Sequence, residues 1–317
     1  MSIEVLRPGA LSTFQDLGRI GYQRFGVHVN GAMDERAHRT ANWLVGNAAE
    51  EATLEITLLG PSLRFNTPAT IALCGADLSP EIDGRPLELA RAVSVAAGQV
   101  LGFGARRRGV RAYLAVGGGY TLPAVMGSRS TNTRAGFGGL GGRPLRKGYF
   151  IGLRRPSTLE GAERASPPAF PPEVLSDADA ALRLLPGRHW DYFSEQARQS
   201  LLGDQYEITS ASDRMGYRLA GPALPMSRPS EFHSEAVCLG TIQVPADGQP
   251  IILMQDRGTT GGYPKMAEII TVDIPRLAQM MPGETLKFEL TDLAHAQGLL
   301  MAQARVFAEM DRPRNPV

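Results

Sequence analysis

Net charge is almost absent from this chain of 317 residues, in which 33 Lys and Arg residues balance 32 Asp and Glu residues. Proteins that bind nucleic acid generally carry a clear basic excess, so the composition argues against that class. The balance also leaves little long-range field to attract highly charged partners.

Cysteine is scarce too, since Cys74 and Cys238 are the only two in the sequence. Two cysteines cannot form a disulfide framework, and their apolar neighbours predict two buried, reduced thiols. No run approaches the roughly 18 apolar residues of a membrane span. Residues 1–9 lack the basic and apolar regions of a secretion signal. We therefore expect a cytoplasmic protein without membrane contact.

Motifs for common cofactors are missing as well. Nothing matches the phosphate-binding pattern GxxxxGK[ST] or the Ala-Met-Lys-Met string of biotin attachment. Residues 136–141 match GxGxxG, but neither a clear strand before them nor a helix after them supports a dinucleotide site. The five His residues show no metal-ligand spacing. We expect no metal site, no covalently bound cofactor and no ATP site on this chain.

Turn-forming residues are abundant instead, with 36 Gly and 23 Pro. Apolar or alternating runs bounded by Gly, Pro or Asp predict strands, and two Asp-Gly pairs at 83–84 and 247–248 predict tight hairpins. Helical patterns are fewer: 34–45, 190–201, 273–280 with Asp273 as its cap, and 292–310. This indicates a mainly β protein with a few helices (α+β). The predicted strands are 54–65, 69–74, 111–116, 206–209, 236–244, 250–254 and 284–290.

The composition shifts once along the chain. Residues 161–177 contain four prolines, including two Pro-Pro pairs, which predict a semi-stiff extended linker. We expect an N-terminal β-barrel-like domain over 1–165, a linker over 166–178 and a C-terminal barrel over 179–317. The helices are too few to alternate with the strands, so two barrels are favoured over a βαβ array.

Four segments combine glycines with polar side chains: 13–34, 117–131, 212–218 and 243–265. Glycines allow backbone N–H groups to approach a ligand oxygen, and Arg, Lys and hydroxyl groups add further donors. Such loops suit a small anionic or carbonyl-bearing ligand. The alternative is that Asp16 with Arg19, and Asp213 with Arg214, are ion pairs that lock irregular turns.

The strings TFQDLGRIGYQRFGVHVNGAMD, LEITLLGP, YLAVGGGY, GSRST, SDRMGYRL and IQVPADGQPIILMQDRGTTGGYPK stand in this order along the chain. On these strings, residues 4–307 resemble the biotin-dependent carboxyltransferase family. Its members include the C subunit of 5-oxoprolinase, KipA-type proteins, proteins like the second subunit of allophanate hydrolase and the carboxyltransferase half of urea carboxylase. The resemblance implies cyclophilin-like β-barrels.

The resemblance also implies a function. We expect a hydrolase subunit, active only in complex with the A and B subunits of 5-oxoprolinase, in which ATP-dependent opening of 5-oxoproline yields glutamate. Two alternatives stay open: carboxyl transfer to urea or another small amide, using carboxybiotin held by a partner, and a KipA-type regulatory protein that binds a KipI-like kinase inhibitor. The resemblance also implies that ATP is handled outside this chain, which agrees with the missing phosphate-binding pattern.

Carboxyl transfer and the activation of a lactam both develop negative charge on a carbonyl or carboxylate oxygen, which hydrogen-bond donors on the protein stabilise. We expect Arg129 and Arg214 to hold an anion, and Lys265 to act as a general acid or carboxylate anchor. Asp256, or else Asp16, would be a base or an orienting partner, while Lys265 could alternatively be a solvated loop charge. The remaining candidates for substrate contact are Gln15, Asp16, Arg19, Ser128, Ser130, Ser212, Gln243, Thr260, Gly261, Gly262 and Tyr263.

Overall fold

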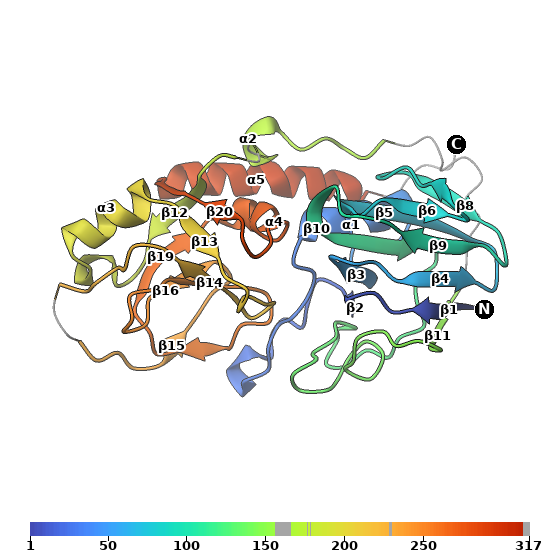
Figure 1. Ribbon diagram of the computed structural model, residues 1–317, viewed down its shortest axis with the longest axis horizontal. Helices are drawn as coiled ribbons and strands as arrows, with labels where there is room; N and C mark the ends of the chain where they lie inside the picture. The colour runs from blue at the N-terminus through green and yellow to red at the C-terminus, as the bar shows by residue number, and fades with distance from the viewer. Residues whose placement is uncertain (156–165, 176, 178, 228–229, 313–317) are drawn as a thin grey trace. The chain divides into compact units, whose positions relative to one another are not determined.

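The computed structural model describes residues 1–155, 166–175, 177, 179–227 and 230–312. Strands dominate and helices are few (Figure 1), which confirms the predicted mainly β fold. The chain divides into two compact units. Unit 1 consists of residues 1–19, 30–169 and 306–317, and unit 2 consists of residues 20–29 and 170–305.

The division between the units falls inside the predicted linker, but the units are not contiguous in sequence. Residues 20–29 belong to unit 2, and residues 306–317 belong to unit 1. Residues 306–317 belong to unit 1 because helix α5 (Leu293–Met310) is continuous and runs past the boundary at 305. The predicted domains, 1–165 and 179–317, are continuous in sequence and therefore assign both of these segments to the other unit.

The expected extended linker is also partly helical. Helix α2 (Pro172–Leu175) begins at the second Pro-Pro pair, where proline is tolerated because the first helical N–H groups need no partner within the helix. Val174 of this helix is fully buried in a cluster with Ile270, Val272 and Leu299. This segment is therefore part of the core of unit 2. Residues 161–165, where the Pro-rich stretch starts, lie outside the described residues.

Unit 1 contains two antiparallel sheets. One has six strands in the order β11-β1-β4-β9-β6-β7, and the other has five in the order β2-β3-β10-β5-β8. The strands of the first are β1 (Ser2–Arg7), β4 (Ser62–Phe65), β6 (Pro80–Ile82), β7 (Arg85–Pro86), β9 (Val100–Phe103) and β11 (Phe150–Gly152). Those of the second are β2 (Leu11–Gln15), β3 (Thr53–Thr57), β5 (Ala69–Asp77), β8 (Ala92–Val95) and β10 (Arg108–Val116).

Alternation along the central strands gives the second sheet two buried faces. Leu73 of β5 and Leu114 of β10 point into the main core of unit 1, which also contains Val5 and Leu63 of the first sheet. The alternate residues of these strands, such as Tyr113, point to the other face and pack in a smaller cluster with helix α1 (Glu35–Leu44). The predicted helix start is confirmed, since the Asp34 side chain accepts a hydrogen bond from the Ala37 N–H at 3.0 Å.

The two Asp-Gly pairs differ in outcome. Asp83 and Gly84 join β6 to β7 with φ of 50° and 78°, as a two-residue hairpin turn requires. Asp247 and Gly248 lie in a longer connection, in which the Gly248 N–H donates to the Pro245 carbonyl at 3.0 Å. The prediction of a second tight hairpin was therefore wrong, because β16 ends at Gln243 and β17 begins only at Ile251.

Unit 2 is built on a sheet of eight strands in the order β20-β13-β14-β17-β16-β19-β12-β21. Its two outermost strands, β20 and β21, are separated in sequence by Lys287 alone. Both edges of the sheet therefore meet on one short segment, and the sheet forms a nearly closed barrel. The strands are β12 (Leu182–Pro186), β13 (Tyr206–Ile208), β14 (Gly216–Ala220), β16 (Thr241–Gln243), β17 (Ile251–Leu253), β19 (Lys265–Ile269), β20 (Thr285–Leu286) and β21 (Phe288–Leu290).

Shorter elements complete unit 2. A two-stranded ribbon joins β15 (Glu235–Ala236) to β18 (Thr260–Gly261). The pattern over 190–201 forms two helices, η3 (Trp190–Tyr192) and α3 (Glu195–Gly203), because Ser194 is extended and caps the second. Helix α4 (Ile274–Leu277) follows η4 (Thr271–Asp273).

Asp273 occupies the expected N-cap position of α4, but its side chain does not cap the helix. The carboxylate instead accepts hydrogen bonds from the Arg183 backbone N–H and guanidinium, at 2.7 Å and 2.5 Å. The sequence could not foresee this contact, because Arg183 lies on β12, far away in the chain. The predicted last helix is confirmed as α5.

The two thiols differ in exposure. Cys74 is buried as expected, and desolvation raises the pKa of its thiol to about 12. Cys238 is exposed, so the expectation that both thiols are buried was wrong. Its apolar neighbour Val237 is buried while the next side chain turns outward. In the described part of the chain, no helix is both long and apolar enough to cross a membrane.

Candidate functional site

Five of the predicted contact residues meet in unit 1, and we call Gln15, Asp16, Arg19, Ser128 and Ser130 the Asp16 cluster. The Asp16 carboxylate accepts hydrogen bonds from the hydroxyls of Ser128 and Ser130 at 2.7 Å and 2.6 Å. It also accepts from the backbone N–H groups of Gly18 at 2.9 Å and Arg129 at 2.5 Å. One carboxylate thereby ties the end of β2 to a loop more than a hundred residues further on.

Arg19 is fully buried in the same cluster. Its guanidinium donates to the carbonyls of Val125 at 2.8 Å and Ser130 at 3.0 Å, and to the Asn30 side chain at 3.1 Å. The Phe137 ring lies 4.7 Å from its central carbon, a cation–π distance. Burial lowers the pKa of this guanidinium, and the Asp16 charge opposes the change.

The Asp16 cluster therefore has the contacts of a structural lock. Its side chains are at most 4 % exposed, and the Gln15 amide bonds to the Thr131 carbonyl and the Gly31 N–H. Asp16 and Arg19 each bond to the loop around residue 128 through their own partners, which differs from the expected alternative of a simple Asp16–Arg19 ion pair. Substrate contact by these residues stays a prediction. Arg129 is partly exposed, and its Nε is buried without a hydrogen-bond partner.

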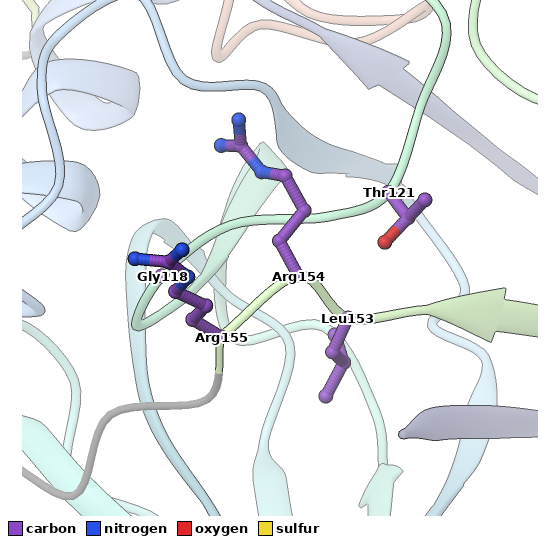
Figure 2. A pocket seen from close by; sticks show the side chains of 5 residues that line it. All are labelled: Gly118, Thr121, Leu153, Arg154 and Arg155. Atoms are coloured by element: carbon purple, nitrogen blue, oxygen red, sulfur yellow. The ribbon is translucent and has the colours of Figure 1, made fainter.

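Unit 1 also has a surface pocket of about 580 Å³, and none of the predicted site residues line it (Figure 2). One of its two guanidinium groups is already paired, because Arg154 bonds to Glu51. The pocket thus offers less convergent chemistry than the strand face of unit 2 described next. Its lining residues are Gly118, Thr121, Leu153, Arg154 and Arg155.

In unit 2, a bulge brings four polar side chains to one face of neighbouring strands β16 and β19. Thr241 lies opposite Glu268, and Gln243 lies opposite Lys265, with a register shift between the two pairs. The extra residue, Met266, reverses the usual alternation, so Lys265 and Glu268 share a face although they are three residues apart. We call Thr241, Gln243, Lys265 and Glu268 the Lys265 face.

Lys265 is not a solvated loop charge, so that alternative was wrong. It is the first residue of β19 and is 5 % exposed. Its ammonium donates to Glu235 Oε1 at 2.8 Å, and this hydrogen bond lowers the pKa of the Glu235 carboxyl. Among the described residues Glu235 is the one side chain that accepts from this ammonium, which leaves N–H groups for a ligand oxygen.

His189 holds the backbone of the same residue. The Lys265 N–H donates to His189 Nδ1 at 3.0 Å, and the His189 N–H donates to the Lys265 carbonyl at 3.0 Å. His189 Nε2 lies 3.7 Å from Glu235 Oε1. Desolvation lowers the pKa of this imidazole, with Glu235 raising it and Lys265 and Arg188 lowering it.

Arg214 and Asp256, predicted as separate catalytic groups, form one ion pair. Two guanidinium nitrogens of Arg214 lie 3.0 Å from the two carboxylate oxygens of Asp256, the forked geometry of a strong pair. Asp213 accepts instead from the N–H groups of Met215 and Gly216, and so locks the turn before β14. The alternative of a pair between Asp213 and Arg214 gains no support from these contacts.

The other predicted residues of unit 2 lie in the β13–β14 turn, in strand β18 and in the segment after β18. Ser212 accepts from the Arg218 N–H at 2.9 Å, which places it in the β13–β14 turn. Thr260 and Gly261 form β18, and a Cβ on Gly261 would lie 2.5 Å from Gln243 Nε2, so a larger residue there would displace the Gln243 amide. Gln243 donates to the Tyr263 carbonyl at 3.3 Å, while the Tyr263 ring is half exposed.

Arg257 and Glu268 are functional candidates that sequence reasoning missed. Arg257 Nε is buried without a hydrogen-bond partner, and among the described residues no carboxylate lies within ion-pair distance of this guanidinium. Burial lowers the pKa of Arg257 and raises that of Glu268. Glu268 accepts from the Thr241 hydroxyl at 2.7 Å and attracts both Lys265 and Arg257 electrostatically.

The available sequence signals for these groups were weak. Arg257 lies within a string already recognised as polar and glycine-rich, so it could have been included. Glu268 lies three residues after Lys265, and only the bulge at Met266 places both on one face. Together these groups can hold an anion or a carbonyl oxygen. Among the described residues, no group of three or more His, Cys, Asp or Glu side chains could hold a metal ion.

Comparison with known proteins identifies the family of the chain. Residues 25–290 match the model of the carboxyltransferase domain, subdomain A and B. The chain belongs to this carboxyltransferase family. The match covers most of both units, including the Lys265 face and the loop of the Asp16 cluster.

Proteins similar to this chain include C subunits of 5-oxoprolinase and a urea amidolyase. The chain is 38 % identical to the C subunit of 5-oxoprolinase from Haemophilus influenzae, over 94 % of each chain, and 36 % identical to that of Escherichia coli, over 97 % of each. It is also similar to the solved structure of K. lactis urea amidolyase, with a TM-score of 0.89 and 32 % identity. That match covers 98 % of this chain but 20 % of the urea amidolyase chain.

Proposed function

We propose that this chain is the C subunit of an ATP-dependent 5-oxoprolinase, which acts with the A and B subunits to convert 5-oxoproline to glutamate. The full-length similarity to two proteins named as the C subunit of 5-oxoprolinase supports this assignment. The observation that carries the chemistry is the buried Lys265 ammonium, which is held by Glu235 beside the Gln243 amide.

The ligand chemistry fits these groups. 5-Oxoproline has a carboxylate and a lactam carbonyl, and its activation places negative charge on the carbonyl oxygen. The Lys265 ammonium and the Gln243 amide offer donors to such an oxygen. Arg257 has an unpaired Nε and would take the carboxylate, while Arg214 is already occupied by Asp256. ATP would be bound elsewhere in the complex.

Reconstitution tests the assignment. The A and B subunits with 5-oxoproline and ATP should form glutamate only when this chain is added, and the chain alone should not turn over ATP. A second arm supplies urea, bicarbonate and ATP, because the urea amidolyase structure is similar to this chain. Glutamate formation that does not depend on this chain would overturn the proposal, and urea-dependent ATP use would replace it with carboxyl transfer.

The site is tested by Lys265→Met in the assembled complex. Loss of an acid or an anion-binding charge should lower turnover by about 10²- to 10⁴-fold. Lys287→Met is the matched control, because Lys287 is exposed between β20 and β21. Gel filtration checks that both variants still assemble. Unchanged turnover in Lys265→Met would remove Lys265 from the site.

A further inference from the structure

The tautomer of His189 is fixed by its neighbours. Because the Lys265 backbone N–H donates to His189 Nδ1, that nitrogen must carry a lone pair, and the proton of the neutral ring is on Nε2. The Nε2–H group then faces Glu235, whose Oε1 lies 3.7 Å from Nε2. The imidazole thus contacts both the backbone of Lys265 and the carboxylate that holds its ammonium.

The surroundings of the ring favour this neutral form. Its faces and edges pack against Tyr192 and Phe232, with ring centroids 5.6 Å and 4.5 Å away. The charged groups that act on the ring are Glu235, Lys265 and Arg188. Desolvation, helped by the two cations, outweighs the attraction of Glu235 and lowers the pKa of the imidazole below its ordinary value of 6.5.

We propose that His189 is a positioning residue for Lys265, and that the site works only while its imidazole is neutral. A second proton would sit on Nδ1 and replace the acceptor of the Lys265 N–H with a donor. The charged ring would also compete with the Lys265 ammonium for Glu235. Both changes would displace the ammonium from its place beside Gln243. The activity readout of this inference rests on the proposed function.

Two substitutions separate positioning from mere packing. In His189→Asn, the amide oxygen takes the place of Nδ1, so the acceptor for the Lys265 N–H remains but cannot be protonated. In His189→Gln, the amide reaches the place of Nε2 instead, and the acceptor is lost. The pair is matched in chemistry and differs in which contact of the imidazole it preserves.

The pH profile of glutamate formation by the assembled complex gives the first readout. Wild type should lose activity as the pH falls through the pKa of His189. His189→Asn should keep most of the activity and lose this acidic limb. His189→Gln should lose activity at every pH, by up to about 100-fold, as small displacements of a reacting group do. Two variants with the wild-type profile, or two equally impaired, would overturn the inference.

A second readout does not depend on activity. In ¹⁵N-histidine spectra of the chain alone, the signals lost in His189→Asn identify His189. Its Nδ1 should show the shift of an unprotonated acceptor at pH 7, and its pKa should rise in Lys265→Met and fall in Glu235→Gln. A protonated Nδ1 at pH 7 would contradict the inference. An inactive wild-type complex with the expected titration would count against the proposed function alone.

Discussion

Among single residues, Asp16 and Lys265 show two different uses of a buried charge. Asp16 accepts four hydrogen bonds, all from within the chain, and so holds a loop in place. Lys265 has one carboxylate partner and lies beside an amide, which leaves donors for a ligand. A charge whose partners are all internal stabilises the fold, whereas a charge with spare donors can bind.

Replacing Asp16 by Asn tests the first use. The amide nitrogen would bring a donor where the carboxylate accepts, so at least one of its four donors would lose its acceptor inside the fold. We expect the free energy of unfolding to fall by about 2–4 kcal/mol, measured by urea denaturation. The control Glu88→Gln changes an exposed ion pair with Arg91 and should cost less than about 0.5 kcal/mol. Equal stability of the two variants would show that the network is not a lock.

Several site residues were predictable from residue type and neighbours. Glycine-rich polar segments of the sequence contain Lys265, Gln243, Asp256 and Arg214, and this context predicts a binding role for them. Which of them pair could not be predicted, because Arg214 and Asp256 are 42 residues apart in the chain. Glu235 was missed for the same reason, since its partner Lys265 lies 30 residues away.

Among the elements, the glycine-rich loop after β10 shows why GxGxxG here is not a nucleotide motif. Gly138 has a φ of 74°, and a Cβ there would lie 2.1 Å from the Ser130 carbonyl oxygen. This oxygen also accepts from Arg19. The glycine therefore allows the loop to pack on the Asp16 cluster rather than on a phosphate.

A matched pair of glycine substitutions measures this packing. Gly136 has a φ of 73°, and a Cβ there would meet nothing within 4 Å. Gly136→Ala should therefore cost about 1–2 kcal/mol for the positive φ alone. Gly138→Ala should cost about 1–3 kcal/mol more, because the methyl group clashes with backbone. Thermal unfolding of both variants provides the comparison, and equal losses would mean that the loop does not need this close approach.

The elements themselves were predicted unevenly. Helix α1 and helix α5 followed their apolar spacing, and the Asp83-Gly84 hairpin followed its turn residues. The bulge at Met266 leaves no mark in the pattern, because Lys265, Met266 and Ala267 are all buried and show no alternation of buried and exposed residues that a bulge could interrupt. The Lys265 face depends on this bulge, so its membership could not be derived from the sequence.

At the scale of the whole molecule, each unit includes a segment that lies within or beyond the other unit in the sequence. Residues 20–29 belong to unit 2, and the end of α5 belongs to unit 1. Within unit 1, the Arg39 guanidinium lies 4.5 Å from the Phe307 ring centroid and 3.6 Å from the Asp311 carboxylate. Val306 and Met310 are each 7 % exposed. The last helical turns therefore contribute to the stability of a unit whose other residues lie far earlier in the sequence.

Truncation tests this contribution. A chain ending at Arg305 should lose at least about 2 kcal/mol of stability in unit 1, because two buried apolar side chains and the contacts of Arg39 are removed. Hydrogen exchange in α1 should accelerate accordingly. A chain ending at Arg312 keeps all these contacts and serves as the control. Identical exchange in α1 for the two truncations would contradict the expectation.

The nearly closed barrel of unit 2 has a consequence for how the protein is made. Its sheet joins β12 to β21 and β13 to β20, and these pairings bring together residues such as Leu182 with Phe288 and Tyr206 with Leu286, which lie 106 and 80 positions apart. On the ribosome, the central strands of unit 2 must wait with open edges until Leu290 has emerged. Unit 1 waits longer still for the end of α5. Until those segments have emerged, the open strand edges of unit 2 can pair with other chains, so a chaperone that covers strand edges is most useful at this stage.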